Sequence, residues 1–285
     1  MGCPCAIHRP YVGIYLQNTA VPRGITPLNP MEPLTMPANS LAPVLSTRPS
    51  LSIDLARDPA EVREAQRLRF EIFSQEMGAS FTDDGIDEDR FDAHCDHLMV
   101  RDSFDGRLVG TTRLLRHEAI LETGGFYTET EFDLRTVLRL PGRFVEVGRT
   151  CIHPDYRGGG AIATLWSGIA PYFSELGYDY LVGCASIGLS AGVAPARALV
   201  EQLLAKQPSA EDCRATPKLP LPALVGSQGA TPCATPPLLK AYLRLGAKVC
   251  SEAAWDPDFK TADVVILLGR RWVNDRYARR FLRAA

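Results

Sequence analysis

The distribution of proline limits where this 285-residue chain can build a packed domain. Nine of its 22 prolines lie in residues 1–50 and seven more in residues 208–237, which leaves six for the rest. Proline fixes φ and has no N–H to donate, so proline-rich sequence seldom continues a helix or a sheet. We therefore expect a disordered segment over residues 1–50 and a single domain over 51–285, with a proline-rich surface loop at about 208–237.

Composition excludes several classes of protein. No apolar run approaches the ~18–20 residues that a membrane-spanning helix needs, and the N-terminus lacks the pattern of a secretory signal. The net charge is only −2, from 31 basic and 33 acidic residues, so no overall positive field favours nucleic acid as a partner. The eight cysteines are scattered and include no Cys-x-x-Cys pair. We therefore expect reduced thiols and a cytoplasmic location.

Helical and strand-like segments alternate along residues 51–285. Apolar spacing predicts a helix over 59–77, with Asp58 as its N-cap, and a helix over 161–176, bent near Pro171. A hairpin signal at Asp105-Gly106 joins two predicted strands. The predicted strands cover residues 97–100, 107–115, 144–151, 180–186 and 263–268. The pattern indicates an α/β fold with a mixed, twisted sheet flanked by helices.

A run of three glycines, Gly158, Gly159 and Gly160, separates the strand that ends near residue 151 from the helix at 161–176. The first turn of a helix directs free N–H groups and the positive end of its dipole toward an anion. Arg157 adds a cation next to these groups. The pattern favours a phosphate-binding loop, although a simple helix cap beside a flexible loop also explains it. It is not a Walker loop, because no Gly-Lys-Ser/Thr follows.

The strand, the Arg-x-x-Gly turn and the helix resemble the acyl-donor loop of the GNAT superfamily of N-acyltransferases, in which backbone amides hold the phosphate on the pantetheine side. The superfamily prefers a small residue where this chain has Ile162, which suggests a donor other than ordinary acetyl-CoA. The order of further residues resembles acyl-homoserine-lactone synthases and long-chain N-acyl amino acid synthases. These residues are Arg69-x-x-x-Phe73, Asp89-x-x-Asp92, Arg113 and Glu146-x-x-Arg149.

Longer segments, spread over roughly residues 53–282, resemble a narrower family. They include Asp92-Ala-His-Cys-Asp-His-Leu98, Gly125-Phe-Tyr-Thr-Glu-Thr-Glu-Phe132 and Asp258-Phe-Lys-Thr-Ala-Asp263. This family is the bacterial L-ornithine Nα-acyltransferases, the first enzymes of ornithine lipid synthesis. The resemblance implies that a (3-hydroxy) fatty acyl group moves from a phosphopantetheine thioester on acyl carrier protein to the α-amine of ornithine, giving lyso-ornithine lipid. It implies no metal and no cofactor beyond this thioester co-substrate.

Glu146 places a carboxylate in otherwise apolar strand sequence, Phe-Val-Glu-Val. A salt bridge to Arg149 would be the ordinary explanation. Amide formation needs a neutral amine, however, and an α-amino group with a pKa of about 8 is largely protonated at pH 7. A partly buried carboxylate could take that proton directly or through water. The resemblance supports this role, so we predict Glu146 as the general base, with a nearby backbone N–H stabilising the oxyanion.

Residues 83–96 carry seven acids and one arginine. A solvated acidic face is the ordinary explanation. The more specific hypothesis is a site for the side-chain ammonium of ornithine, which we assign to Asp89 and Asp92. The resemblance places Arg69, Arg113 and Arg149 around the same site. Guanidinium groups suit carboxylate or phosphate recognition, and ion pairing with the acidic segment explains these arginines equally well.

Histidine and cysteine residues suggest no metal centre or nucleophile. His94-Cys95-Asp96-His97 are consecutive, so on an extended chain their side chains alternate in direction and do not converge on one ion. We expect His97 to be a structural residue with hydrogen bonds. Cys151 and Cys184 lie in apolar strand sequence and are expected in the core. Ser186 could help to hold the thioester.

Six arginines and one acid lie between Arg270 and Arg283, with Val273, Tyr277 and Phe281 forming an apolar stripe. A terminal helix packed on the domain explains the stripe. Weak, salt-sensitive contact of residues 270–285 with an anionic membrane is the alternative. Two other functions also stay open. The acceptor could be another amino acid or S-adenosylmethionine, or the chain could be a non-catalytic module that binds acyl carrier protein.

Overall fold

The computed structural model describes residues 50–77, 84–157, 160–206, 213–222 and 230–279. The helices and strands below belong to one unit, Ser46–Ala285. The predicted disordered segment lies outside the described residues apart from Ser50, and the proline-rich loop lies partly outside them. Both therefore stay predictions.

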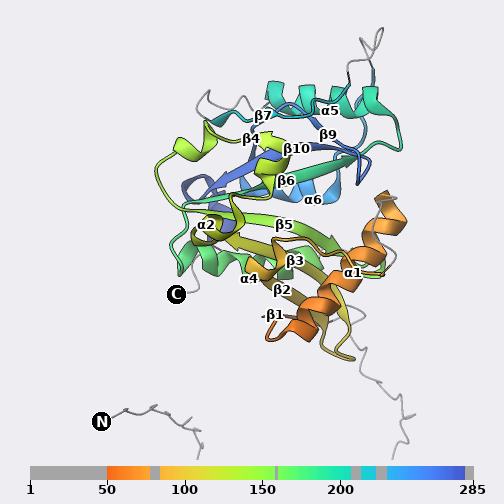
Figure 1. Cartoon of the computed structure of the whole chain (residues 1–285), viewed down its shortest axis with the longest axis vertical. Helices are drawn as coiled ribbons and strands as arrows, with labels where there is room; N and C mark the ends of the chain where they lie inside the picture. The colour runs from red at the N-terminus through yellow and green to blue at the C-terminus, as the bar shows by residue number, and fades with distance from the viewer. Residues whose placement is uncertain (1–49, 78–83, 158–159, 207–212, 223–229, 280–285) are drawn as a thin grey trace, which may run out of the picture. The chain divides into compact units, whose positions relative to one another are not determined.

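An eight-stranded mixed sheet organises this unit (Figure 1). The strand order is β1-β2-β3-β5-β6-β10-β8, and β9 pairs with β10 off this path. β5 and β6 run parallel, whereas the other pairs in this sheet are antiparallel. The strands are β1 Leu51–Leu55, β2 Cys95–Asp102, β3 Leu108–Arg116, β5 Phe144–Ile152, β6 Tyr180–Gly188, β8 Lys248–Val249, β9 Ala254–Asp256 and β10 Thr261–Gly269. β4 Phe132–Asp133 and β7 Thr216–Pro217 form a separate pair.

Helices cover both faces of the sheet. The longer helices are α1 Pro59–Met77, α4 Gly160–Ser174, α5 Val193–Lys206 and α6 Pro237–Leu245. Neighbouring residues of a strand point to opposite faces. Met99 of β2 accordingly packs in the cluster formed by α1, while Leu98 and Val100 pack in the cluster that contains α4, α5 and α6. The predicted α/β class, a mixed sheet flanked by helices, is confirmed.

Local signals explain how these elements begin. Asp58 caps α1 as predicted, because its Oδ1 accepts hydrogen bonds from the backbone N–H groups of Ala60 and Glu61 at 2.9 and 3.0 Å. Gly106 has a φ of +76° in the turn between β2 and β3, a conformation that favours glycine. Such turns and caps determine where helices and strands begin and end. Pairing between strands that are distant in the sequence then determines the order of the strands in the sheet.

A β-bulge and a change of pairing distort the middle of the sheet. The register places Thr111 opposite Cys151 and Arg113 opposite Gly148, so two β5 residues face one β3 residue. One of the two, Arg149, has a φ of +49°. On the other side of β5, the parallel pairing with β6 ends at Glu146 and Val182. Beyond this point the two strands diverge (Figure 1).

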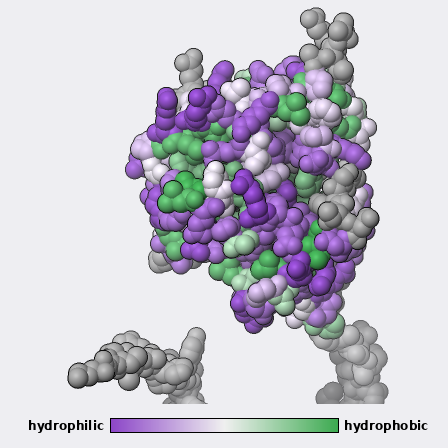
Figure 2. Space-filling view, viewed as in Figure 1, coloured by the Kyte–Doolittle hydropathy of each residue, from purple (hydrophilic) through white to green (hydrophobic). Residues whose placement is uncertain are grey.

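The described part of the C-terminal segment packs on the unit. Asn274 caps α7 (Asp275–Tyr277), and Val273 and Tyr277 pack against the cluster that contains α4. Phe281 lies outside the described residues. The face shown in Figure 2 is mostly hydrophilic, with apolar residues in small separate groups. Among the described residues, no helix is long and apolar enough to cross a membrane. Membrane contact through residues 270–285 therefore stays a prediction.

Candidate active site

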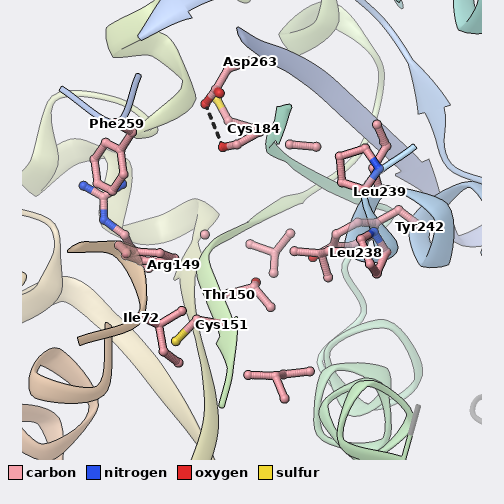
Figure 3. Close-up of a pocket in the computed structure, with 18 of the residues that line it drawn as sticks. Ile72, Arg149, Thr150, Cys151, Cys184, Leu238, Leu239, Tyr242, Phe259 and Asp263 are labelled. Carbon is pink, nitrogen blue, oxygen red and sulfur yellow. Dashed lines mark hydrogen bonds between the residues drawn. The ribbon is translucent and has the colours of Figure 1, made fainter. Parts of the chain in front are cut away.

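A cavity of about 300 Å³ opens where β5 and β6 diverge (Figure 3). This is the lower end of the range of about 300–1,000 Å³ for pockets that hold small molecules. Its apolar wall comes from α1, α4, β5, α6 and the turn before β10, and includes Ile72, Phe73, Ile152, Ile162, Leu238, Leu239, Tyr242 and Phe259. Figure 3 shows Asp263 and Cys184 close together on one side, and Leu238, Leu239 and Tyr242 on another. The cavity therefore combines an apolar surface with a polar end.

Glu146 lies on this cavity with its carboxylate held by backbone groups. The residue is only 3 % exposed. Its Oε1 accepts hydrogen bonds from the backbone N–H and the hydroxyl of Thr128, both at 2.6 Å, and its Oε2 accepts one from the N–H of Tyr127 at 2.7 Å. A carboxylate offers about four acceptor positions. One position therefore remains, on Oε2. The alternative explanation, a salt bridge to Arg149, is wrong, because that arginine pairs with other acids.

Burial makes Glu146 a better proton acceptor than an exposed glutamate. Loss of solvation raises its pKa, and this outweighs the opposing effect of the hydrogen bonds from Thr128 and Tyr127. A raised pKa is what a general base near neutral pH requires. The geometry is compatible with the predicted role, which itself stays a prediction.

The predicted substrate-binding residues form a buried ion-pair network beside the cavity. Arg69, with 0 % exposure, donates to both carboxylate oxygens of Asp92 at 2.9 Å and to Asp87 Oδ2 at 2.8 Å. Arg113 donates to the same Asp92 at 3.1 Å. Burial opposes ionisation of Asp92, but the hydrogen bonds and charges of Arg69 and Arg113 outweigh it and hold its pKa well below the usual range. Asp92 is therefore an ionised, fully paired carboxylate.

The other half of the network reaches the cavity wall. Asp89 receives two hydrogen bonds from Arg113, at 2.6 and 2.8 Å, and one from Arg149 at 3.2 Å. Arg149 also pairs with Asp87 at 3.3 Å. Its guanidinium lies 4.7 Å from the ring centres of Tyr127 and Phe259, and the residue lines the cavity. Three arginines thus balance three aspartates. Substrate binding by these residues stays a prediction, and Arg149 is the member placed to contact a ligand.

The predicted acyl-donor loop is described only in part. The guanidinium of Arg157 donates to the carbonyl of Ile152 at 3.0 and 2.9 Å and pairs with Glu76, and Arg157 lines the cavity. Gly160 begins α4. Gly158 and Gly159 lie outside the described residues, so phosphate binding at this loop stays a prediction.

The remaining predicted residues have structural surroundings. His97 makes a 3.0 Å contact from Nε2 to the carbonyl of Asp92. Burial raises the pKa of the Cys151 thiol to about 12 and that of Cys184 well above its usual value, so both remain thiols. Ser186 donates to Asp263 at 3.2 Å and lines the cavity.

Sequence reasoning missed two acids, Asp263 at the polar end of the cavity and Glu131 next to it. One carboxylate oxygen each of Glu131 and Asp263 and the sulfur of Cys184 lie within 4.8 Å of one another. Among the described residues this is the group with the spacing of metal ligands, and it does not include the His94–His97 run. The available signal was Asp263, a charged residue at the start of an otherwise aliphatic strand.

Comparison with known proteins gives consistent results. Residues 68–167 match the acetyltransferase (GNAT) domain. The L-ornithine N(alpha)-acyltransferase of Rhizobium meliloti (strain 1021) is 38% identical over 255 residues, which cover 82% of this chain and 85% of that protein. The protein of the same name from Agrobacterium fabrum is 38% identical over 250 residues, covering 80% and 84%. Among solved structures, FeeM, an N-acyl amino acid synthase from uncultured soil microbes, superposes with a TM-score of 0.48 at 12% identity, covering 79% of this chain and 94% of that one.

The sheet and the matched domain define an acyltransferase of the GNAT class. At this level of identity and coverage, the chain belongs to the L-ornithine Nα-acyltransferase family. The fold and the family expected from the sequence are both confirmed.

Proposed function

We propose that this protein transfers a fatty acyl group from a phosphopantetheine thioester on acyl carrier protein to the α-amine of ornithine, giving lyso-ornithine lipid. The observation that carries the proposal is the apolar cavity of about 300 Å³ with the carboxylate of Glu146 at its polar end. An acyl chain gains from the apolar wall, and an amine gains from the acid. The choice of ornithine rests on the names of the relatives at 36–38% identity.

The chemistry needs one base and no acyl-enzyme. Glu146 takes a proton from the α-ammonium through the acceptor position left on Oε2, directly or through water. The neutral nitrogen attacks the thioester carbonyl, so that a C–N bond forms and the C–S bond breaks. The nitrogen gives up its second proton as the C–S bond breaks, and the leaving thiolate takes up that proton to become a thiol. Protonated Glu146 then releases its own proton to water. A backbone N–H of β5 near the bulge stabilises the oxyanion.

The donor supplies its own activation as a thioester, so the proposal requires no metal and no redox cofactor. Arg157 and the first turn of α4 hold the phosphate of the pantetheine arm. Ile162 and Ile152 also line the cavity and suit an apolar ligand. Arg149 contacts the acceptor. Arg69 and Arg113 hold Arg149 in place through their ion pairs with Asp89 and Asp92.

An amine panel tests the proposal. The protein is incubated with 3-hydroxyacyl carrier protein and ornithine, lysine, other amino acids or S-adenosylmethionine, and products are identified by mass spectrometry. We expect acyl-ornithine, lost in Glu146→Gln while binding of the acyl carrier protein survives. Glu122→Gln, an exposed acid outside the cavity, is the matched control. Undiminished turnover in Glu146→Gln would exclude Glu146 as the general base. Thioester binding by the wild-type protein without any product would indicate a non-catalytic carrier-binding module.

We also propose weak, peripheral contact with the inner membrane through the basic segment 270–285, on the cytoplasmic side. Its support is the charge of the segment, six arginines and one acid. Sedimentation with anionic liposomes tests this directly. Binding should weaken as salt rises and should fall in a chain that ends at residue 269. Sedimentation that is unaffected by higher salt and by the loss of residues 270–285 would refute the proposal.

A further inference from the structure

Three elements bring an acidic cluster to the polar end of the cavity. Glu131 is the last residue of α3 (Thr128–Glu131), Cys184 lies on β6 and Asp263 lies on β10. Their oxygen and sulfur atoms lie within 4.8 Å of one another. Cys184 and Asp263 line the cavity, together with Asp256, and Figure 3 shows the first two side by side. Asp263 and Cys184 are therefore open to a ligand in the cavity, and a carboxylate oxygen of Glu131 lies within 4.8 Å of both.

The acids of this cluster lack a cation, unlike those of the ion-pair network. Both carboxylate oxygens of Glu131 are buried and have no hydrogen-bond partner of good geometry among the described residues, although the hydroxyl of Tyr127 is close enough to lower the pKa of this carboxyl. Asp263, 4 % exposed, accepts only from two hydroxyls among the described residues, Thr261 at 2.7 Å and Ser186 at 3.2 Å. Arg149 makes its ion pairs with Asp87 and Asp89. A buried carboxylate without a partner is costly, so the cluster is suited to a cation from outside the chain.

The charge state of the cluster agrees with this reading. Burial, followed by the negative charges of Asp263 and Asp256, raises the pKa of Glu131 to about 8. Burial also raises the pKa of Asp263 to about 6, with Asp256 as a further cause. The hydroxyl of Tyr127 lowers the pKa of Glu131, and the charge of Arg149 lowers the pKa of both acids. A bound cation would favour the ionised forms of both acids.

We propose that Glu131 and Asp263 bind the side-chain ammonium of the acceptor and thereby select a diamino acid. The inference rests on the proposed function and names the residues that recognise its substrate. The nearby base supports it. Thr128 Oγ1 lies 2.6 Å from Glu146 Oε1 and 3.6 Å from Cys184 Sγ, so one side chain separates the base from the cluster. The carbon chain between the two nitrogens of ornithine is also short, like the gap between Glu146 and the cluster. The α-amine can therefore reach Glu146 while the side-chain ammonium reaches the cluster.

An ammonium fits this cluster better than a metal ion. It brings three N–H donors, and the two oxygens of Glu131 make no hydrogen bond of good geometry with the described residues. A metal would need the thiolate of Cys184, but burial raises the pKa of that thiol well above its usual value. Asp89 and Asp92, to which the sequence assigned the ammonium, are each already bound by two arginines.

Two matched acceptors, ornithine and norvaline, test the proposal with the wild-type protein itself. Norvaline has the side chain of ornithine without its terminal ammonium, so the ratio of kcat/KM for the two reports on the cluster. We expect ornithine to be preferred by about 10- to 100-fold, the scale of one hydrogen bond to a charged group. Glu131→Gln should abolish most of this preference through the KM for ornithine and leave norvaline unchanged. Asp263→Asn is the second variant.

Asp133→Asn is the matched control, because it removes an acid two residues from Glu131 that is paired with Arg135 on the surface. It should keep the wild-type preference. Equal use of ornithine and norvaline by the wild-type protein overturns the inference and leaves the proposed function standing. An equal loss for both acceptors in Glu131→Gln assigns a structural role and also overturns it. Activity lost to a chelator and restored by zinc would indicate a metal site instead. Failure to acylate ornithine at all overturns the proposed function and this inference together.

Discussion

The substitution Asp92→Asn tests whether the ion-pair network stabilises the site. Asp92 accepts two hydrogen bonds from Arg69 at 2.9 Å, one from Arg113 at 3.1 Å and one from the N–H of Asp89 at 2.9 Å. Asparagine keeps the shape and removes the charge. Breaking a buried pair typically costs about 3–5 kcal/mol. Since Arg69 retains Asp87, we expect a loss near the lower limit, about 3 kcal/mol, or about 6–12 °C in Tm for a domain of this size.

The stability lost in Asp92→Asn should also depend on pH, in a direction that follows from the pKa of Asp92. Arg69 and Arg113 overcome the effect of burial and hold the pKa of Asp92 well below its usual range, whereas in the unfolded chain it is about 3.9. A group with a depressed pKa in the folded state stabilises the protein above its unfolded pKa, and this contribution is lost as pH falls toward the folded value. Wild type has this contribution to lose and Asp92→Asn does not. The difference in stability should therefore be largest at neutral pH and narrow below about pH 4.

Urea unfolding at pH 7 and at a series of lower pH values measures both effects. Asp133→Asn again serves as control, because its pair with Arg135 is exposed to solvent and should contribute little to stability. The reasoning fails if Asp92→Asn costs no more than the control. It also fails if the difference in free energy of unfolding between the variant and wild type is independent of pH.

Three further substitutions probe the cavity. Gly183→Ala should lower stability by about 1–3 kcal/mol in urea unfolding, because its Cβ would lie 2.3 Å from the carbonyl oxygen of Val147, whereas Gly188→Ala on the same strand meets open space and should be neutral. Arg157→Ala should raise the KM for the acyl carrier protein about 10-fold with little change in kcat, and an unchanged KM would remove Arg157 from donor binding. Leu238→Trp fills part of the apolar wall and should shift products to shorter acyl chains by mass spectrometry; an unchanged profile would place the chain elsewhere.

Local patterns predicted the strands of the sheet well and its flanking elements poorly. The five predicted strands correspond to β2, β3, β5, β6 and β10, and the two predicted helices to α1 and α4. In the main sheet β1, β8 and β9 were missed, and so were the helices α5 and α6. α6 begins at a proline within the region expected to be a loop, where N-terminal proline is compatible with a helix. The bulge in β5 depends on the register with β3, which is a long-range property and leaves no local signal.

The sequence pointed to a cavity residue where one residue broke a pattern. Glu146 was recognised because an acid in an apolar strand needs an explanation, and it does line the cavity. Its actual partners, the N–H groups of Tyr127 and Thr128, come from a short turn nineteen and eighteen residues away. That turn had no predicted structure, so the only structural partner that the sequence offered for Glu146, as the alternative to its role as a base, was the nearby Arg149.

The acids near the cavity divide into two sets with opposite chemistry, and the division depends on which strands supply arginine. Asp89 and Asp92 lie against β3 and β5, whose bulge brings Arg113 and Arg149 to the same acidic segment. Glu131 and Asp263 lie beyond the point where β5 leaves β6, and the strand there contributes Cys184 instead of a cation. In sequence the first set is the more conspicuous, because its acids are clustered. Once folded, the chain neutralises that cluster itself, and the inconspicuous pair, which has no arginine partner among the described residues, is the one that a substrate ammonium can ionise and pair with.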